Sequence, residues 1–423
     1  MGICVIELAY ALVIIIGQIN FGTIMCYPSP TSNEIQDLHH LKPDSIEWSL
    51  YNSISSLSAI IGSFLVSGFL KCMHNSRKKT IFAISFMATV FWFLNCLTKV
   101  NIWAGVATRA LLGIVMGSFS TIGPMYLIEI APEGESGFFG SLNQLGIVIG
   151  LLLFDFIGPS LNYMELNYVG GGISALQAIL IWTIKESPAA ETQNIYDKEK
   201  ESLPDYQESL CQKKNAIGIL IGIFIMLLQQ FCGINAVLTN IAGIMSDSGL
   251  AMNGNYQGGI ATAAQLLAVF ISALIIDKIG RKITWIISCA LIAASLLVFA
   301  LNTKYDWLKI LPLICVFIFQ FGYGLGMGPI PGFIIPQYFN ESVRPTASAI
   351  TVAFNWLFTF AIIFIWPFMN SGMGMFGSLL FFMGIAVVSI IFGALCIQEI
   401  KEDAVDQETE DRTKPDVLKE FII

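Results

Sequence analysis

The chain has 423 residues, of which 55% are hydrophobic and only 12% are charged, and its mean hydropathy is +0.71. A soluble domain carries about 25% charged residues, so this composition excludes a water-soluble globular protein and favours a helical protein embedded in a lipid bilayer. The formal net charge of −8 argues against a nucleic-acid partner, because phosphate binding needs a basic surface.

Twelve apolar runs follow one another along the chain, each close to the roughly 20 residues that a helix needs to cross a bilayer. They lie at about 5–27, 50–70, 80–98, 102–128, 138–158, 167–184, 215–240, 256–276, 283–301, 308–336, 346–369 and 374–397. The sequence therefore predicts an all-α membrane protein with twelve transmembrane helices.

Two polar stretches divide the chain into parts. We expect an N-terminal six-helix bundle over 1–184, a cytosolic linker over 185–214, a C-terminal six-helix bundle over 215–397 and an acidic cytosolic tail over 398–423. Seventeen lysine and arginine residues fall on the side of the termini and four or five on the other. By the positive-inside rule both termini are cytosolic, and the plasma membrane is the expected location.

The two halves of the chain repeat each other. The segment 123–129, Gly-Pro-Met-Tyr-Leu-Ile-Glu, ends the fourth run, and Gly-Pro-Ile-Pro-Gly at 328–332 lies near the end of the tenth. A basic cluster at 77–79 follows the second run, and Asp-Lys-Ile-Gly-Arg-Lys at 277–282 follows the eighth. Such repeats indicate two pseudo-symmetric bundles with a substrate site between them, worked by alternating access.

These motifs resemble the sugar porters of the major facilitator superfamily, which include the facilitative glucose transporters. The pieces that carry the resemblance are Arg109-Ala-Leu-Leu-Gly113, Gly140-Ser-Leu-Asn-Gln144, Gln229-Gln230-Phe-Cys-Gly233-Ile-Asn235, Asp277 to Lys282, Gly328-Pro-Ile-Pro331 and Asn355-Trp356. The resemblance implies the major facilitator fold and a sugar substrate.

Uncharged amides recur inside the spans. An amide side chain both donates and accepts hydrogen bonds, as a sugar hydroxyl does, and it carries no charge to desolvate. The alternative is that these amides only join helices to one another. The resemblance favours sugar binding and also implicates one threonine and one glycine, the latter standing where the family usually has tryptophan. The candidate substrate-binding residues are Gln144, Gln229, Gln230, Asn235, Gln265, Asn355, Thr359 and Gly332.

Two spans contain residues that break helices. On an ideal helix Gln230 and Asn235 lie about 140° apart, so both can face one ligand only if the helix bends at Gly233. Glycines and prolines at 322–332 predict a second broken, mobile helix, with close packing through small residues as the alternative. The candidate gating residues are Gly233, Thr239, Asn240, Pro329 and Pro331.

Charged residues at the cytosolic ends of the spans match the family's latch between the halves, although several partners are missing from the N-terminal half. We expect Glu129 to pair with Arg281 or Arg344 and so to hold an outward-open state. Interchangeable surface pairs of little energetic value are the alternative. The candidate latch residues are Arg77, Glu129, Glu186, Asp277, Arg281 and Arg344.

Asp155 is the main acidic residue expected within a span. It lies eleven residues after Gln144, so both should face the same side of one helix. We expect a solvated carboxylate at the outer rim, and a protonation site is the alternative. The first span lacks the acidic residue that proton-coupled relatives carry, which favours a uniporter for a hexose or similar neutral sugar.

Three other functions are less favoured by the sequence. A proton symporter would need a titratable group in the pathway, and a non-transporting sugar sensor would need a longer signalling segment. An enzyme is not expected, because no nucleotide-binding or catalytic motif appears. No cofactor, metal site or obligate protein partner is expected, and the nine cysteines show no ligand or disulfide spacing.

Overall fold

The structure is a computed structural model, and it describes residues 5–132, 136–187, 212–247, 249–339 and 343–397. Within these ranges all regular secondary structure is helical. Nine helical segments of the described residues are long and apolar enough to cross a membrane. One of them spans 51 residues and holds two of the predicted runs, and α7 (Tyr163–Leu180) and α12 (Gly254–Ile279) cover most of the remaining two. Every predicted span is therefore largely helical.

Six long helices make up most of the described N-terminal half. They are α1 (Val5–Cys26), α3 (Ile46–Cys72), α4 (Arg77–Asn95), α5 (Ile102–Glu129), α6 (Ser136–Ile157) and α7 (Tyr163–Leu180). Polar side chains accept hydrogen bonds from free amides at several N-termini, as Ser45, Ser76 and Asn162 do. These caps fix where each helix starts after its turn.

The C-terminal half contains several interrupted helices. Its elements are α9 (Lys213–Phe231), α10 (Ile234–Thr239), α11 (Ile241–Ser246), α12 (Gly254–Ile279), α13 (Arg281–Tyr305), α14 (Leu311–Gly322), a π-helical turn (Tyr323–Met327), α15 (Ile330–Gln337) and α16 (Arg344–Cys396). Gly374 inside α16 has φ 70° and ψ 171°, a conformation open to glycine alone. This kink divides α16 into two helical segments, which correspond to the last two predicted spans.

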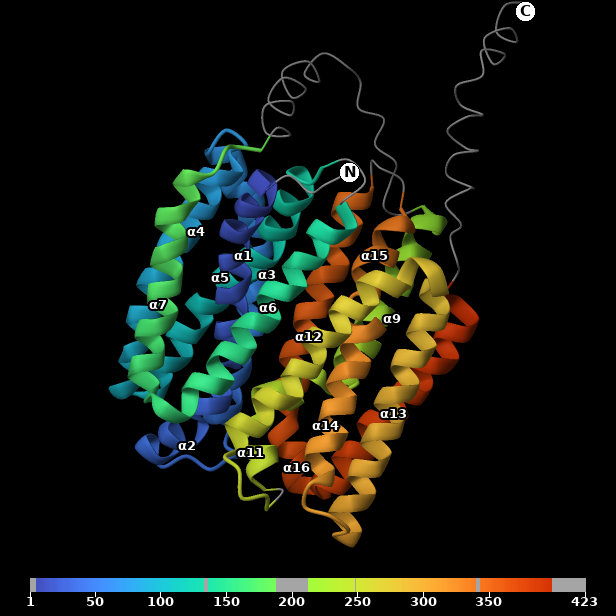
Figure 1. Ribbon diagram of the computed structural model, residues 1–423. Coiled ribbons are helices and arrows are strands. Elements are labelled where there is room, and N and C mark those ends of the chain that lie inside the picture. Colours follow the sequence, from blue (N-terminus) through green and yellow to red (C-terminus); the bar gives the residue numbers. More distant parts are fainter. Residues whose placement is uncertain (1–4, 133–135, 188–211, 248, 340–342, 398–423) are drawn as a thin grey trace, which may run out of the picture.

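The two halves stand side by side and touch mainly along two helix pairs. Figure 1 shows the N-terminal half in blue to green and the C-terminal half in yellow to red. Helix α6 packs against α12, and α3 packs against α16. We call the end that carries the start of α4 and the end of α5 the linker face. The opposite end, where α1 finishes and α6 finishes, is the α2 face.

One element of the α2 face was not predicted. No helix was predicted between the runs at 5–27 and 50–70, but Pro28–His39 form the helix α2. Proline at its first position suits a helix start, and its buried residues include Ile35. Helix α2 contacts α7 and α11, one from each half, so it covers the junction between them.

Candidate functional site

Four of the predicted sugar-binding amides form one hydrogen-bonded cluster in the C-terminal half. The Asn355 amide group donates to Gln229 Oε1 at 2.9 Å, and Asn355 Oδ1 accepts from Gln230 Nε2 at 3.2 Å. Asn235 Nδ2 donates to Gln230 Oε1. Residues from α9, α10 and α16 thus meet at Asn355, and all their groups can exchange these bonds for bonds to a ligand.

The cluster depends on the expected break at Gly233. Helix α9 ends at Phe231, Gly233 has φ 92°, and α10 begins at Ile234. This left-handed conformation is costly for residues with a side chain, and a Cβ at Gly233 would lie 2.4 Å from the Phe382 ring. The change of direction brings Asn235 beside Gln230, which a straight helix would not allow.

The second broken helix contacts the same cluster. Gln229 Nε2 donates to the carbonyls of Met327 at 2.8 Å and Gly328 at 3.0 Å. Neither carbonyl has its usual helix partner, because Pro331 has no N–H and the Gly332 amide bonds to the Pro329 carbonyl. Gln265 of α12 packs against Gly324 in the π-helical turn. The Gln265 side chain is 2% exposed, and its Oε1 has no hydrogen-bond partner among the described residues. A buried acceptor of this kind favours a ligand or water.

Two aromatic residues that were not among the candidate substrate-binding residues lie next to this cluster. Trp356 follows Asn355 and lies 5.7 Å, centroid to centroid, from Phe21 of α1. Its indole Nε1 is buried and without a partner among the described residues. Such a ring can pack against a sugar and donate to a hydroxyl. The Asn-Trp pair was visible in the sequence, but its contact with the other half was not.

The remaining predicted substrate residues lie outside the cluster of four amides. Gln144 is half-buried on α6. Thr359 is buried one turn after Asn355 and donates to the Asn355 carbonyl at 2.9 Å. Gly332 is exposed, and a Cβ there would meet no atom within 4 Å. A side chain added at Gly332 would therefore meet open space.

The predicted gating residues lie at the helix breaks. Thr239 closes α10 and donates to the Asn235 carbonyl at 2.8 Å, and Asn240 separates α10 from α11. Pro329 and Pro331 fall where the π-helical turn passes into α15. Both spans predicted to break are thus broken, while their role in gating stays a prediction.

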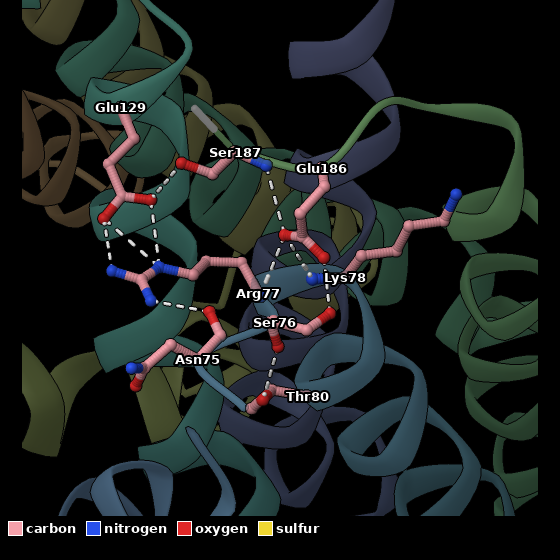
Figure 2. A network of polar contacts seen from close by, with 8 residues as sticks. All are labelled: Asn75, Ser76, Arg77, Lys78, Thr80, Glu129, Glu186 and Ser187. Atoms are coloured by element: carbon pink, nitrogen blue, oxygen red, sulfur yellow. Dashed lines mark hydrogen bonds and ion pairs between the residues drawn. The ribbon is translucent and has the colours of Figure 1, made fainter. Parts of the chain in front are cut away.

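The charged residues of the linker face form a network within the N-terminal half (Figure 2). Arg77 donates two hydrogen bonds to the Glu129 carboxylate, from Nε to Oε2 at 3.0 Å and from Nη2 to Oε1 at 2.9 Å. Ser187 Oγ donates to the same carboxylate at 2.6 Å. Glu186 accepts from the backbone amides of Arg77 and Lys78 at the start of α4, which is where a helix favours negative charge.

This arrangement differs from the expected latch. The pairing of Glu129 with Arg281 or Arg344 was expected for an outward-open state and stays a prediction; in the described conformation Glu129 bonds to Arg77 and Ser187. Arg77 starts the helix next to the end of α5, so it reaches Glu129 without any contribution from the C-terminal half. The side chains of Asp277 and Arg344 lie outside the described residues.

The placement of Asp155 is a correction to the sequence-based expectation. It was expected as a solvated carboxylate at the rim, yet it is 1% exposed. Its Oδ1 accepts from the Cys26 thiol and its Oδ2 from the Thr262 hydroxyl, both at 3.3 Å. Helix α12 covers this side of α6 and removes the carboxyl group from water.

Hydrogen bonds between the halves gather toward the α2 face. Besides the Asp155–Thr262 bond, Ser29 Oγ accepts from the Ala242 amide at 3.1 Å, and Ser371 Oγ donates to Asp44 at 3.1 Å. Phe156 and Tyr256 also stack there, with centroids 6.4 Å apart. The described structure therefore has its α2 face closed.

Comparisons with known proteins agree with this architecture. The family model described as sugar (and other) transporter matches residues 15–411. The chain is 26% identical to a facilitated trehalose transporter of Bombyx mori, covering 95% of this chain and 86% of that protein. It is equally 26% identical to the sugar transporter ERD6-like 8 of Arabidopsis thaliana, over 94% and 90% of the two chains.

Solved structures share the fold. The inward open conformation of the xylose transporter XylE from E. coli aligns with a TM-score of 0.80 at 18% identity, covering 96% of this chain and 99% of that one. A D-xylose-proton symporter aligns with a TM-score of 0.79 at 20% identity, over 93% and 98%. The predicted twelve-helix major facilitator fold is thereby confirmed. The chain belongs to the sugar transporter family, a group of multi-pass membrane transporters of the major facilitator superfamily.

Proposed function

We propose that this protein is a facilitative transporter that carries a hexose or a similar neutral sugar across a membrane by alternating access. The observation that supports this most directly is the buried amide cluster around Asn355, joined to a tryptophan that contacts the opposite half. Amides match the donor and acceptor pairs of sugar hydroxyls. When the two halves rock against each other, a sugar can reach a site between them from one side of the membrane and then leave it toward the other.

We propose that the linker face is cytosolic, as the basic loops predict, and that the protein resides in the plasma membrane. On this orientation the closed α2 face points outward. The partners that this function requires are the sugar and the bilayer. Neither catalysis nor a cofactor is part of the proposal.

Uniport is the mode that the sequence of α1 supports. Residues 21–25 are Phe, Gly, Thr, Ile and Met, so no carboxyl group adjoins Phe21 in the pathway. A proton symporter remains the second candidate because Asp155 is buried near the outer end of α1. Sugar uptake at pH 5.5 and 7.5, with and without a protonophore, separates the two modes. Acid stimulation abolished by the protonophore would contradict uniport.

Counterflow of radiolabelled sugar in proteoliposomes tests the proposal as a whole. A carrier that alternates between two faces accumulates labelled sugar transiently against a load of unlabelled sugar. A non-transporting sugar sensor would bind the sugar without any counterflow, and a channel would give flux without it. A panel of hexoses and disaccharides in the same assay defines the substrate.

A further inference from the structure

The buried carboxyl group of Asp155 joins three helices of both halves. Asp155 lies two residues before the end of α6, close to the α2 face. Cys26, the last residue of α1, donates to one carboxyl oxygen, and Thr262 of α12 donates to the other, both at 3.3 Å. Among the described residues this is the most deeply buried polar bridge between the halves. None of its three residues belongs to the amide cluster around Asn355.

The surroundings of Asp155 offer no compensating charge. Phe154 and Phe156 flank it on α6, and the groups facing it from α1 and α12 are the Cys26 thiol and the Thr262 hydroxyl, both neutral. Arg109 of α5 is engaged with the Ile24 carbonyl at 2.8 Å and Ser55 at 3.1 Å. Within the described residues no basic side chain pairs with Asp155.

Two further titratable groups of α2, which packs on α6, are also occupied elsewhere. Glu34 accepts from the Tyr163 amide at 2.8 Å, and the His39 ring bonds to the Thr98 carbonyl at 2.7 Å. The remaining one, Asp37, is exposed and would only add negative charge. An ionised carboxylate with two weak donors in a sealed contact carries a high desolvation cost. A protonated carboxyl group does not, because its own O–H can donate to the Thr262 hydroxyl oxygen in place of the bond from Thr262.

The cost disappears when the α2 face opens. Alternating access separates α6 from α12 at this end, which admits water to the carboxyl group and breaks its bond with Thr262. The two conformations therefore differ in their affinity for one proton at this position, and a ligand with different affinities for two states shifts their populations.

We propose that Asp155 is a proton-binding site that controls opening of the α2 face, protonated while that face is closed and ionised while it is open. The inference rests on the alternating access of the proposed function. The proton enters and leaves by the same face, because Asp155 stays covered in the closed conformation. Acid on the α2 face thus holds the transporter closed there without driving sugar uptake.

The test measures the two conformations directly, without sugar. Spin labels at Val100→Cys and Leu308→Cys, exposed positions in α2-face loops of opposite halves, report the separation of the halves by double electron–electron resonance. Other accessible cysteines are replaced by serine, and the full chain is placed in nanodiscs at pH 5.5 and 7.5. Binding of one proton changes an equilibrium by at most tenfold per pH unit, so the open-to-closed ratio should fall about tenfold to a hundredfold in acid.

Three variants decide whether Asp155 is the group responsible. Asp155→Asn stays neutral, so its ratio should equal the acidic value of the native chain at both pH values. Asp44→Asn is the matched control, because that acid also bridges the halves through Ser371 but is partly exposed. It should keep the native pH response. Thr262→Ala should lower the closed population at both pH values while the pH response persists.

A ratio that does not change with pH in the native chain would overturn the inference, and so would a pH response that survives in Asp155→Asn. Sugar counterflow on the same preparations decides the proposed function separately. A native chain that shows counterflow but no pH-dependent opening would retain the transport function and lose the proton site.

Discussion

The two halves use buried amides in different ways. In the N-terminal half Asn95 donates to Asn167 at 2.9 Å between continuous helices, and Gln177 bonds to the Ile14 carbonyl. In the C-terminal half the amides meet where α9 and the α14–α15 span are broken, and they bond to one another and to released carbonyls. Amides between unbroken helices join those helices, whereas amides at breaks stay available to a ligand.

Removing the centre of the amide cluster should have the largest effect. Asn355→Ala leaves Gln229 and Gln230 without their shared partner and removes a candidate sugar contact. The Asn355 amide can make two hydrogen bonds to a sugar, one as donor and one as acceptor. Each is worth about 1.4 kcal/mol, so we expect sugar counterflow to fall about a hundredfold when both are lost. Asn167→Ala removes an amide pair of the N-terminal half and should lower thermal stability while leaving the apparent sugar affinity unchanged. Equal loss of affinity in both variants would erase the contrast between the halves.

Straining the break between α9 and α10 should have the next largest effect. Gly233→Ala imposes a left-handed backbone on alanine and places its Cβ against Phe382. We expect a loss of about 2 kcal/mol in the free energy of unfolding, measured as a lower melting temperature in detergent, together with slower counterflow. Gly172→Ala is the control, since Gly172 lies in the unbroken α7 and its added Cβ meets nothing within 4 Å. An unchanged melting temperature and counterflow rate in Gly233→Ala would show that the glycine at this break is not required.

The charged network of the linker face should matter less. Arg77→Ala leaves the partly exposed Glu129 with Ser187 alone. We expect a loss of about 1 kcal/mol in stability, seen as a small decrease in melting temperature. Arg77→Lys should restore only part of it, because lysine cannot form the two parallel bonds of a guanidinium group. Full rescue by lysine would indicate that charge alone is needed.

Filling the space at Gly332 should have the smallest effect. Gly332→Trp adds a ring where the family usually has one and where the structure leaves room. A packed aromatic ring contributes about 0.5–1.5 kcal/mol, so we expect hexose to bind about threefold to tenfold more tightly. Inhibition of counterflow by unlabelled hexose measures this. An unchanged apparent affinity would mean that the open space at Gly332 does not limit binding.

Local pattern was enough for much of this structure. The apolar runs predicted all twelve spans, because a bilayer leaves few alternatives to a helix of that length. The break at Gly233 followed from the angle between Gln230 and Asn235 and was found where expected. Helix α2 was missed because Pro28–His39 is short and polar, and part of its stability comes from contacts with both halves.

The sequence by itself determined the fold class, the family and the identity of the candidate amides, since these depend on hydrophobicity and on motifs within single segments. Only the tertiary structure decided which partners meet. Arg77, rather than a residue of the other half, reaches Glu129 because α4 starts beside the end of α5. Asp155 is buried because α12, more than 100 residues away along the chain, covers it. Burial and pairing depend on the packing of distant segments, which no local pattern encodes.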